Sequence, residues 1–226
     1  MRSLNTYFDH TNLKANATSA DIIKLCDEAK AYEFASVCVN GAYVPLAAEQ
    51  LKDSEVKVTT VVGFPLGMMS TAAKVFETEQ ACKDGADEID MVINVGALKE
   101  KNFDYVEAEI AQIVEVAAKY DSIVKVIMEV CYLSPDEISK AARLSVKAGA
   151  AYVKTSTGFG PSNGSPEVVS RLSKTMGSKV KIKAAGGIRD LATAIKMIKR
   201  GADRIGSSSS LEIMQEAIQI QEGAQE

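Results

Sequence analysis

Short apolar runs alternate with longer amphipathic stretches along the whole sequence. The runs are rich in β-branched residues and end near a glycine, a proline or a polar residue, a pattern that is typical of buried strands. The stretches between them carry helix-start and helix-stop signals. We predict eight strands, at residues 7–9, 36–39, 58–64, 88–94, 123–130, 152–156, 180–185 and 204–206.

The clearest helix signals bracket residues 134–149. Ser134 can cap a helix, Pro135 fits the first helical position, and Glu137 completes a capping box. Gly149 favours the left-handed conformation that ends a helix. Two more helices are predicted, one after Ser165 and one between Asp190 and Gly201.

Three helix-to-strand junctions share one pattern, in which glycine and alanine precede an apolar strand. They lie at residues 85–90, 149–154 and 201–206. Because strand side chains alternate between two faces, equal offsets from the glycine predict a shared side-chain direction. Three residues occupy the same offset: Asp90, Lys154 and Gly206.

Repeated β-α units in one domain require a parallel sheet covered by helices, either an open doubly wound sheet or a closed barrel. Eight units within 226 residues favour the barrel. The predicted fold is therefore an α/β TIM barrel, (β/α)8, formed by residues 1–226 as a single domain. Its active site would lie at the carboxyl ends of the strands, with phosphate bound by the loops after strands seven and eight.

Composition is that of a soluble globular protein, with 46% hydrophobic residues and a net charge of −4. A chain without a broad basic field is a poor candidate for nucleic-acid binding. No apolar run approaches the ~20 residues that span a membrane. Asp9 and His10 interrupt the region where a signal peptide needs its apolar stretch. We expect a cytoplasmic location and neither a nucleic-acid nor a membrane partner.

The four cysteines show no C-x-x-C spacing, and His10 is the only histidine. A structural zinc site is therefore poorly supported, and reduced, mostly buried thiols are expected. The scarcity of histidine also argues against a metal-dependent aldolase and a Ser-His-Asp hydrolase. We expect a structural role for His10 and no bound metal.

Two lysines stand on predicted strands shortly before a glycine. Lys154 lies in a β-branched run that breaks at Gly158. Lys183 lies in a short strand that ends at the glycine pair 186–187. Burial and a second nearby cation both lower the pKa of an amine, which yields a nucleophile suited to Schiff-base chemistry. Taken singly, each lysine could instead be a surface charge at a strand end.

Asp90 is a lone carboxylate in an otherwise apolar run, and a buried carboxylate requires a partner. Either Lys154 or Lys183 could supply that partner. A carboxylate beside two lysines can carry protons to and from the intermediates of an imine mechanism. The alternative is a purely structural ion pair.

Two loops of small residues follow the last two predicted strands. Gly186 and Gly187 follow the Lys183 strand, and Gly-Ser-Ser-Ser at 206–209 opens the final helix. Small residues let backbone N–H groups approach an anion, serine hydroxyls add donors, and the helix N-terminus adds a favourable dipole. The loops predict a phosphate site, with a serine-rich turn as the alternative.

Seven motifs, in this order, resemble those of the deoxyribose-phosphate aldolase family, which are class I aldolases with a TIM-barrel fold. The resemblance covers nearly the whole chain. The motifs are DHT at 9–11, VCVN at 37–40, VVGFP at 61–65, EIDMVIN at 88–94, VKTSTGF at 153–159, KAAGGIR at 183–189 and GSSS at 206–209.

This resemblance implies reversible cleavage of 2-deoxy-D-ribose 5-phosphate to D-glyceraldehyde 3-phosphate and acetaldehyde in deoxyribonucleotide catabolism. No metal or organic cofactor is implied. Lys154 would be the Schiff-base lysine, and Asp90 and Lys183 the proton-transfer pair. We also expect a homo-oligomer, either a dimer or a tetramer.

The resemblance further implies a supporting polar network at Asp9 and Thr11, and a cysteine near the substrate entrance, Cys38. Ser207 departs mildly from the threonine or alanine common in the family. Residues 221–226 contain no tyrosine, whereas well-studied members end in one that assists proton transfer, so turnover or stereochemical control is expected to differ. The implied substrate and phosphate contacts are Thr157, Gly158, Gly186, Gly187, Gly206, Ser208 and Ser209.

Two other functions fit the same residues. A related Schiff-base barrel, transaldolase-like or dehydroquinase-like, would act on another carbonyl substrate, and product analysis separates it. A barrel that binds a phosphorylated ligand without catalysis would keep the glycine and serine loops but would tolerate replacement of Lys154.

Overall fold

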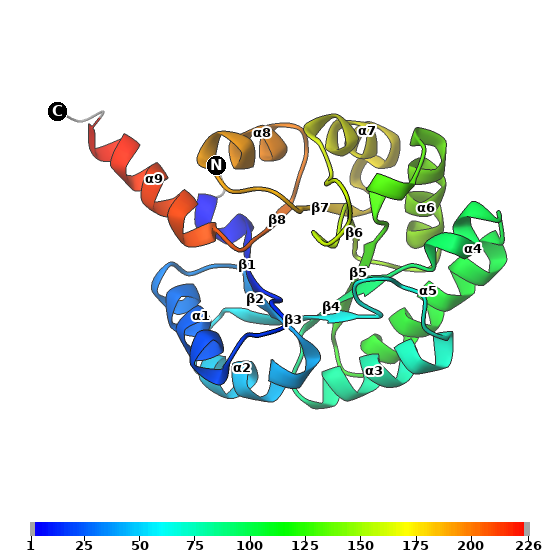
Figure 1. Ribbon diagram of the computed structural model, residues 1–226, viewed down its shortest axis with the longest axis horizontal. Helices are drawn as coiled ribbons and strands as arrows, with labels where there is room; N and C mark the ends of the chain where they lie inside the picture. Colours follow the sequence, from blue (N-terminus) through cyan, green and yellow to red (C-terminus); the bar gives the residue numbers. More distant parts are fainter. Residues whose placement is uncertain (1–2, 224–226) are drawn as a thin grey trace.

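Eight parallel strands pair in chain order and close into a barrel, with β1 paired to both β2 and β8. The structure, a computed structural model, describes residues 3–223, so the end of the predicted tyrosine-free tail, residues 224–226, lies outside the described part. Figure 1 shows the strands at the centre and the helices around them. The predicted TIM barrel is confirmed.

The strands are β1 (Phe8–Asn12), β2 (Ser36–Val39), β3 (Lys57–Val62), β4 (Glu88–Val92), β5 (Ile123–Ile127), β6 (Tyr152–Lys154), β7 (Lys181–Ala185) and β8 (Arg204–Ser207). The α-helices are α1 (Ser19–Ala31), α2 (Val44–Leu51), α3 (Thr71–Lys83), α4 (Val95–Lys99), α5 (Phe103–Ala118), α6 (Pro135–Lys147), α7 (Pro166–Met176), α8 (Leu191–Lys199) and α9 (Ser210–Gly223). Short 3₁₀ helices cover Leu4–Tyr7, Gly41–Tyr43, Val130–Tyr132 and Gly177–Lys179.

All eight predicted strands are present, but several boundaries were wrong. The runs predicted at 58–64, 88–94, 123–130 and 152–156 extend beyond the carboxyl ends of β3 to β6. The chain stays buried past these ends, as at Thr155 and Ser156, so apolar periodicity cannot mark where pairing stops. β5 ends at Ile127, and Glu129, with a left-handed φ of 51°, turns the chain into the 3₁₀ helix Val130–Tyr132. Tyr7, predicted to begin the first strand, belongs instead to a 3₁₀ turn.

The predicted helix caps are present. Ser134 and Glu137 form a reciprocal capping box at the start of α6, with Pro135 as the first helical residue. Ser165 and Asp190 cap α7 and α8 by accepting backbone N–H bonds through their side chains. The three boundaries follow from local chemistry and need no tertiary contact.

The three repeated glycines end α3, α6 and α8 in one geometry. Gly85, Gly149 and Gly201 have φ values of 105°, 87° and 106°, which L side chains rarely adopt. After each glycine, the alanine N–H bonds a carbonyl in the last helical turn, for example Ala86 to the Ala81 carbonyl at 3.0 Å. This Schellman arrangement delivers the chain into β4, β6 and β8 with one register, as the aligned offsets predicted.

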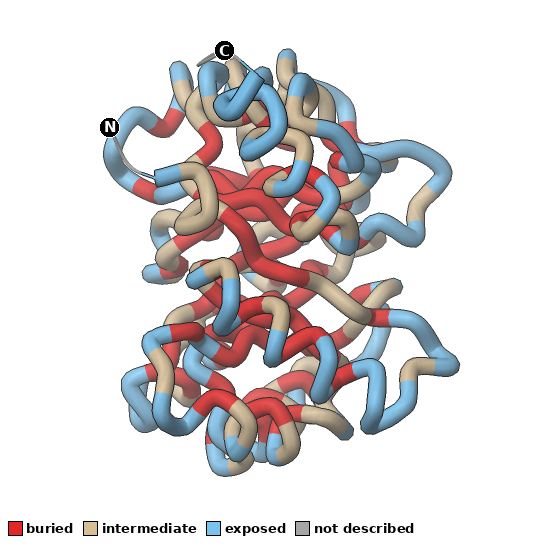
Figure 2. Tube along the Cα trace, turned by 90° about the vertical axis from the view of Figure 1, so that its left-hand side faces the viewer, coloured by how far each residue is buried: buried red, intermediate tan, exposed pale blue. Residues whose placement is uncertain are grey.

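Apolar residues fill the space between the strands and the helices, and Figure 2 shows the buried segments gathered in the middle of the molecule. The inside of the barrel differs, because charged side chains replace much of the branched aliphatic filling usual in such barrels. No helix within residues 3–223 is long and apolar enough to span a membrane. The interior charged residues are Asp9, Glu88, Asp90, Lys125, Lys154, Lys183 and Arg204, all at most 8% exposed.

Candidate active site

Lys154 ends β6 and lines a cavity of about 450 Å³. Its side chain is 4% exposed, and its Nζ donates to Asp90 Oδ2 at 2.8 Å. A lysine on a short strand, buried on all sides except toward a cavity, is placed to meet a small ligand. The surface alternative for Lys154 is therefore wrong.

Asp90 accepts hydrogen bonds from three lysine side chains at once. Its Oδ2 accepts from Lys154 at 2.8 Å and from Lys183 at 2.7 Å, while Oδ1 accepts from Lys125 at 2.8 Å. The expected partnership with Lys154 or Lys183 is thus present with both. Lys183 is also fully buried, so the surface alternative is wrong for this lysine too. The three lysines come from adjacent strands, β5, β6 and β7, while Asp90 stands on β4.

A second layer of charges lies behind this group. Lys183 contacts Asp9 on β1, and Asp9 Oδ1 accepts from Arg204 Nη1 at 2.5 Å. Arg204 reaches Glu88 through both terminal nitrogens at 3.2 Å. Because β4 and β8 are not neighbours, the contact between Arg204 and Glu88 crosses the barrel interior.

The surroundings of the three buried lysines lower the pKa of Lys154 and raise those of Lys125 and Lys183. Burial and then the Lys183 cation lower the pKa of Lys154, and Asp90 only partly opposes this shift. Burial acts on Lys183 as well, but Asp9 and Asp90 together raise its pKa. Lys125 behaves like Lys183, because Asp90 and Glu88 outweigh burial and raise its pKa. Lys154 is therefore the lysine of this group most readily deprotonated.

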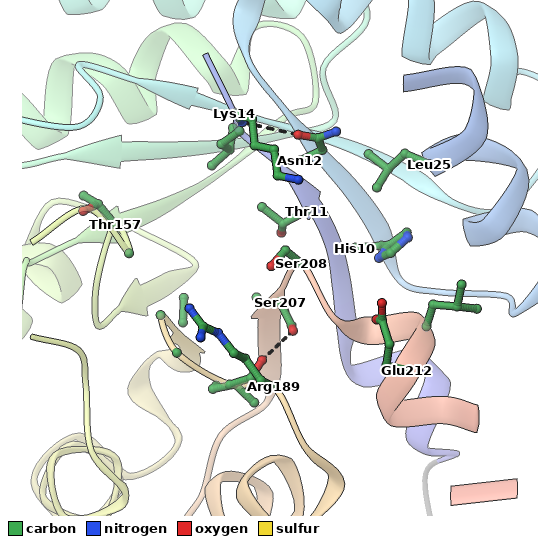
Figure 3. Close-up of a pocket in the computed structure, with 18 of the residues that line it drawn as sticks. His10, Thr11, Asn12, Lys14, Leu25, Thr157, Arg189, Ser207, Ser208 and Glu212 are labelled. Atoms are coloured by element: carbon green, nitrogen blue, oxygen red, sulfur yellow. Dashed lines mark hydrogen bonds between the residues drawn. The ribbon is translucent and has the colours of Figure 1, made fainter. Parts of the chain in front are cut away.

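The loops after β7 and β8 form another side of the cavity. Gly186 has a φ of 90°, and a Cβ there would lie 2.2 Å from Asn163 Oδ1, so only glycine fits. Ser207 Oγ donates to the Ile188 carbonyl at 2.7 Å, which ties the two loops together. Figure 3 shows Ser207, Ser208 and Arg189 on this side of the cavity.

Most of the predicted substrate and phosphate contacts line the cavity, whereas five predicted site residues do not: Asp9, Cys38, Asp90, Lys183 and Ser209. Asp9, Asp90 and Lys183 lie behind Lys154, and Ser209 uses its backbone N–H to bond Ser207 Oγ at 2.9 Å. A Cβ on Gly206 would lie 3.1 Å from Lys183 Cε, so this glycine also makes room for the lysine. The lining residues among those predicted are Thr11, Lys154, Thr157, Gly158, Gly186, Gly187, Gly206 and Ser208.

The supporting residues have specific partners. Thr11 Oγ1 donates to the Asp9 carbonyl at 2.8 Å. Cys38 is 1% exposed, packs with Leu13 and Val61, and is not at an exposed cavity mouth. His10 Nε2 lies 2.8 Å from a Glu28 carboxylate oxygen on α1, and both residues line the cavity, so the structural role of His10 stays a prediction. All four cysteines are free, and three are buried.

Three charged residues of the site were missed from sequence. Lys125 interrupts the apolar run of β5 in the same way that Asp90 interrupts β4, so the rule that found Asp90 could have found it. Glu88 and Arg204 begin their strands and read as ordinary boundary charges. Within residues 3–223, no group of three or more histidine, cysteine or carboxylate side chains is arranged to hold a metal ion.

Comparison with known proteins agrees with this geometry. Residues 4–216 match the family described as DeoC/LacD family aldolase. A deoxyribose-phosphate aldolase of Geobacillus sp. (strain WCH70) is 55% identical over 92% of this chain and 92% of its own length. One from Thermococcus kodakarensis is 51% identical over 96% of this chain and 97% of its own.

Among solved structures, the deoxyribose phosphate aldolase of Aeropyrum pernix superposes with a TM-score of 0.88 at 32% identity. The match covers 94% of this chain and 89% of that protein. A barrel with three buried lysines around one carboxylate, a matching family description and relatives more than half identical lead to one conclusion. The chain belongs to the DeoC/LacD family of aldolases.

Proposed function

We propose that this chain is a class I aldolase that reversibly cleaves 2-deoxy-D-ribose 5-phosphate into D-glyceraldehyde 3-phosphate and acetaldehyde. The observation that carries the proposal is the Lys154 amine, which is buried, lines the cavity and has a lowered pKa beside Asp90 and Lys183. The names of the relatives support the choice of substrate.

The first half of the reaction builds an imine. The uncharged Lys154 amine adds to the C1 carbonyl of the open-chain sugar, and a proton reaches the carbonyl oxygen to give a carbinolamine. Loss of water, after protonation of the C1 hydroxyl, gives a cationic imine. Lys183, which does not line the cavity, supplies the proton through Asp90 Oδ2, the oxygen that accepts from both Lys154 and Lys183.

The second half breaks the C2–C3 bond. A base removes the C3 hydroxyl proton, C3 becomes the aldehyde of glyceraldehyde 3-phosphate, and the bonding electrons move to the cationic imine to give an enamine. Protonation of C2 and addition of water then release acetaldehyde and regenerate the amine. No electron acceptor is needed, because the imine nitrogen takes up the electron pair.

The substrate phosphate fits the opposite side of the cavity. Gly186, Gly187 and Ser208 line it, and Arg189 adds a guanidinium at the same edge. Positive φ values at both glycines leave backbone N–H groups open to an anion, and α9 begins at Ser210, just after this loop. Thr157 and Gly158 from the loop after β6 would contact the sugar carbons between the phosphate and Lys154.

Product analysis tests the proposal. The purified protein is incubated with 2-deoxy-D-ribose 5-phosphate in EDTA, and acetaldehyde and glyceraldehyde 3-phosphate are quantified with separate coupled assays. We expect equal amounts of both products and no loss of rate in EDTA. Turnover of a transaldolase or dehydroquinase substrate instead, or activity that EDTA removes and metal restores, would contradict the proposal.

Ser208→Glu is expected to raise KM for 2-deoxy-D-ribose 5-phosphate at least about tenfold, near 1.4 kcal/mol. Ser208 is exposed and lines the cavity, so a carboxylate there repels the dianion without disturbing the core. KM for unphosphorylated 2-deoxy-D-ribose should change less than about threefold. Ser208→Gln, of equal size but neutral, is the control, and an equal loss on both sugars would exclude a phosphate site here.

We also propose that the protein acts in the cytoplasm as a homo-oligomer, a dimer or a tetramer. The Aeropyrum pernix relative is described as tetrameric. Several large apolar side chains are exposed on this chain, including Leu66 at 72%, Phe76 at 69% and Met68 at 62%, and such residues are enriched where subunits meet. Sedimentation velocity over a hundredfold concentration range tests this, and a monomer throughout would contradict it.

A further inference from the structure

The charges buried inside the barrel balance only when one of the four basic side chains is uncharged. Every member of this group touches another, so the group forms one network. From β2, Cys38 adds no charge, because burial raises the pKa of its thiol, and Ser36 is neutral. β3 contributes the neutral Thr59. The network contains three carboxylates and four basic groups: Asp9, Glu88 and Asp90, against Lys125, Lys154, Lys183 and Arg204.

Three residues of the network lie outside the cavity and form ion pairs with other members of the network. Lys125 Nζ lies 2.7 Å from Glu88 and 2.8 Å from Asp90, and Arg204 joins Glu88 to Asp9. Neither Glu88, Lys125 nor Arg204 lines the cavity. They therefore touch no substrate and can act on the reaction only through their neighbours.

An uncompensated charge in a protein interior is strongly disfavoured, so the network selects the protonation state with zero net charge. Lys183 contacts two carboxylates and Lys125 contacts three, whereas Lys154 contacts Asp90 alone. Removing the proton from Lys154 consequently breaks the fewest ion pairs. The pKa shifts agree, since burial lowers the pKa of Lys154 while carboxylates overcome burial to raise those of Lys125 and Lys183.

We propose that Glu88, Lys125 and Arg204 are positioning residues whose charges, balanced against those of Asp9, Asp90 and Lys183, keep Lys154 as the uncharged amine of the barrel interior. The proposal rests on the imine chemistry proposed above. It also gives the network a role in bond cleavage. The cationic imine adds one unpaired positive charge, and conversion to the neutral enamine removes it, so the imbalance favours breaking the C2–C3 bond.

The test uses substitutions that change the network charge in opposite directions. Glu88→Gln removes a negative charge with almost no change in shape, and Lys125→Met removes a positive charge. The readout is the rate at which acetaldehyde and cyanoborohydride label Lys154, located by peptide mapping, as a function of pH. The pH profile of kcat/KM for cleavage is measured alongside it.

Glu88→Gln should move the acid limb of both profiles to lower pH by about one unit or more, because a protonated Lys154 loses a counterion. Lys125→Met should move the limb to higher pH by a similar amount. The double variant Glu88→Gln/Lys125→Met restores the balance, and its limb should return to within about 0.3 units of the wild-type position. A role in folding alone cannot produce shifts of opposite sign that cancel.

Glu109→Gln is the matched control, because Glu109 is an equally buried carboxylate that pairs with Lys74 at 2.8 Å between α3 and α5, outside the barrel. It should not move the limb. The proposal would be overturned if the acid limb of the pH profiles stays in place in both single variants, or moves in the same direction in both. If Lys125→Met does not fold, the shift in Glu88→Gln alone decides. Wild-type protein that is not labelled at Lys154 would instead refute the proposed function.

Discussion

Lys154→Met is expected to lower kcat for cleavage of 2-deoxy-D-ribose 5-phosphate by at least about 10⁴-fold, near 5.4 kcal/mol in the activation barrier. Without the amine there is no imine to accept the electrons of the C2–C3 bond. Lys183 and Lys125 cannot substitute, because both are held as ammonium ions by two or more carboxylates. The measurement is a steady-state assay that couples glyceraldehyde 3-phosphate to a dehydrogenase.

The variant should still fold, because methionine fills most of the space of lysine and removes a group that carries no net charge in the balanced network. Circular dichroism and the melting temperature check this. Lys57→Met, which removes an exposed lysine from the start of β3, is the control and should keep wild-type turnover. A folded Lys154→Met protein within about 100-fold of the wild-type rate would contradict the assigned role.

Asp90→Asn is expected to lower kcat by about 10²- to 10⁴-fold, the usual range for loss of a proton-transfer group. It should also destabilise the fold by about 3–5 kcal/mol, because the buried ammonium groups of Lys125 and Lys183 lose their shared counterion and Lys154 loses its acceptor. Leucine at this position would remove the hydrogen-bond acceptors as well as the charge. Asparagine removes the charge and keeps one acceptor, so its effect is easier to interpret. Urea unfolding together with steady-state kinetics measures both effects.

Lys183→Met should lower kcat by a similar factor, and the two substitutions should not add. Asp90 and Lys183 share a 2.7 Å contact and act on the same proton, so most of the function is lost with the first change. The double variant Asp90→Asn/Lys183→Met should be more stable than Asp90→Asn, because it restores the charge balance. If the two effects on turnover multiply, or if the double variant is less stable than either single variant, Asp90 and Lys183 do not act as one unit.

The matching side-chain positions on β4, β6 and β8 could be predicted, because the turn that precedes each strand determines where the strand begins. Gly85, Gly149 and Gly201 each end a helix in the same left-handed geometry, and the next residues enter the strand at a fixed offset. That offset brought Asp90 and Lys154 to the same side, where they form a hydrogen bond. A short-range rule therefore placed two residues that lie 64 positions apart.

The rest of the network depends on closure of the barrel. Arg204 and Glu88 meet only because β8 returns beside β1 and their side chains cross the interior. Nothing near either residue in the sequence signals that contact. Strand ends were missed for a related reason, since buried apolar residues such as Ile93 and Met128 continue the pattern after β4 and β5 end.

The number of charges in the interior could not be judged without the partners. From sequence, Lys125 is one lysine in an apolar run, and its contacts with Asp90 and Glu88 appear only when β4 and β5 pair. Lys183 and Lys154 look alike along the chain. The structure separates them, because Asp9 reaches Lys183 and not Lys154.

The central claim is that the Lys154 amine forms the covalent intermediate. Incubation with acetaldehyde and sodium borohydride, in EDTA, reduces any imine to a stable secondary amine, and digestion followed by mass spectrometry locates it. We predict one ethylated lysine, Lys154, with activity lost in proportion to the labelling. Labelling of Lys183 or Lys125 instead, or full activity after borohydride with no modified lysine, would contradict the account.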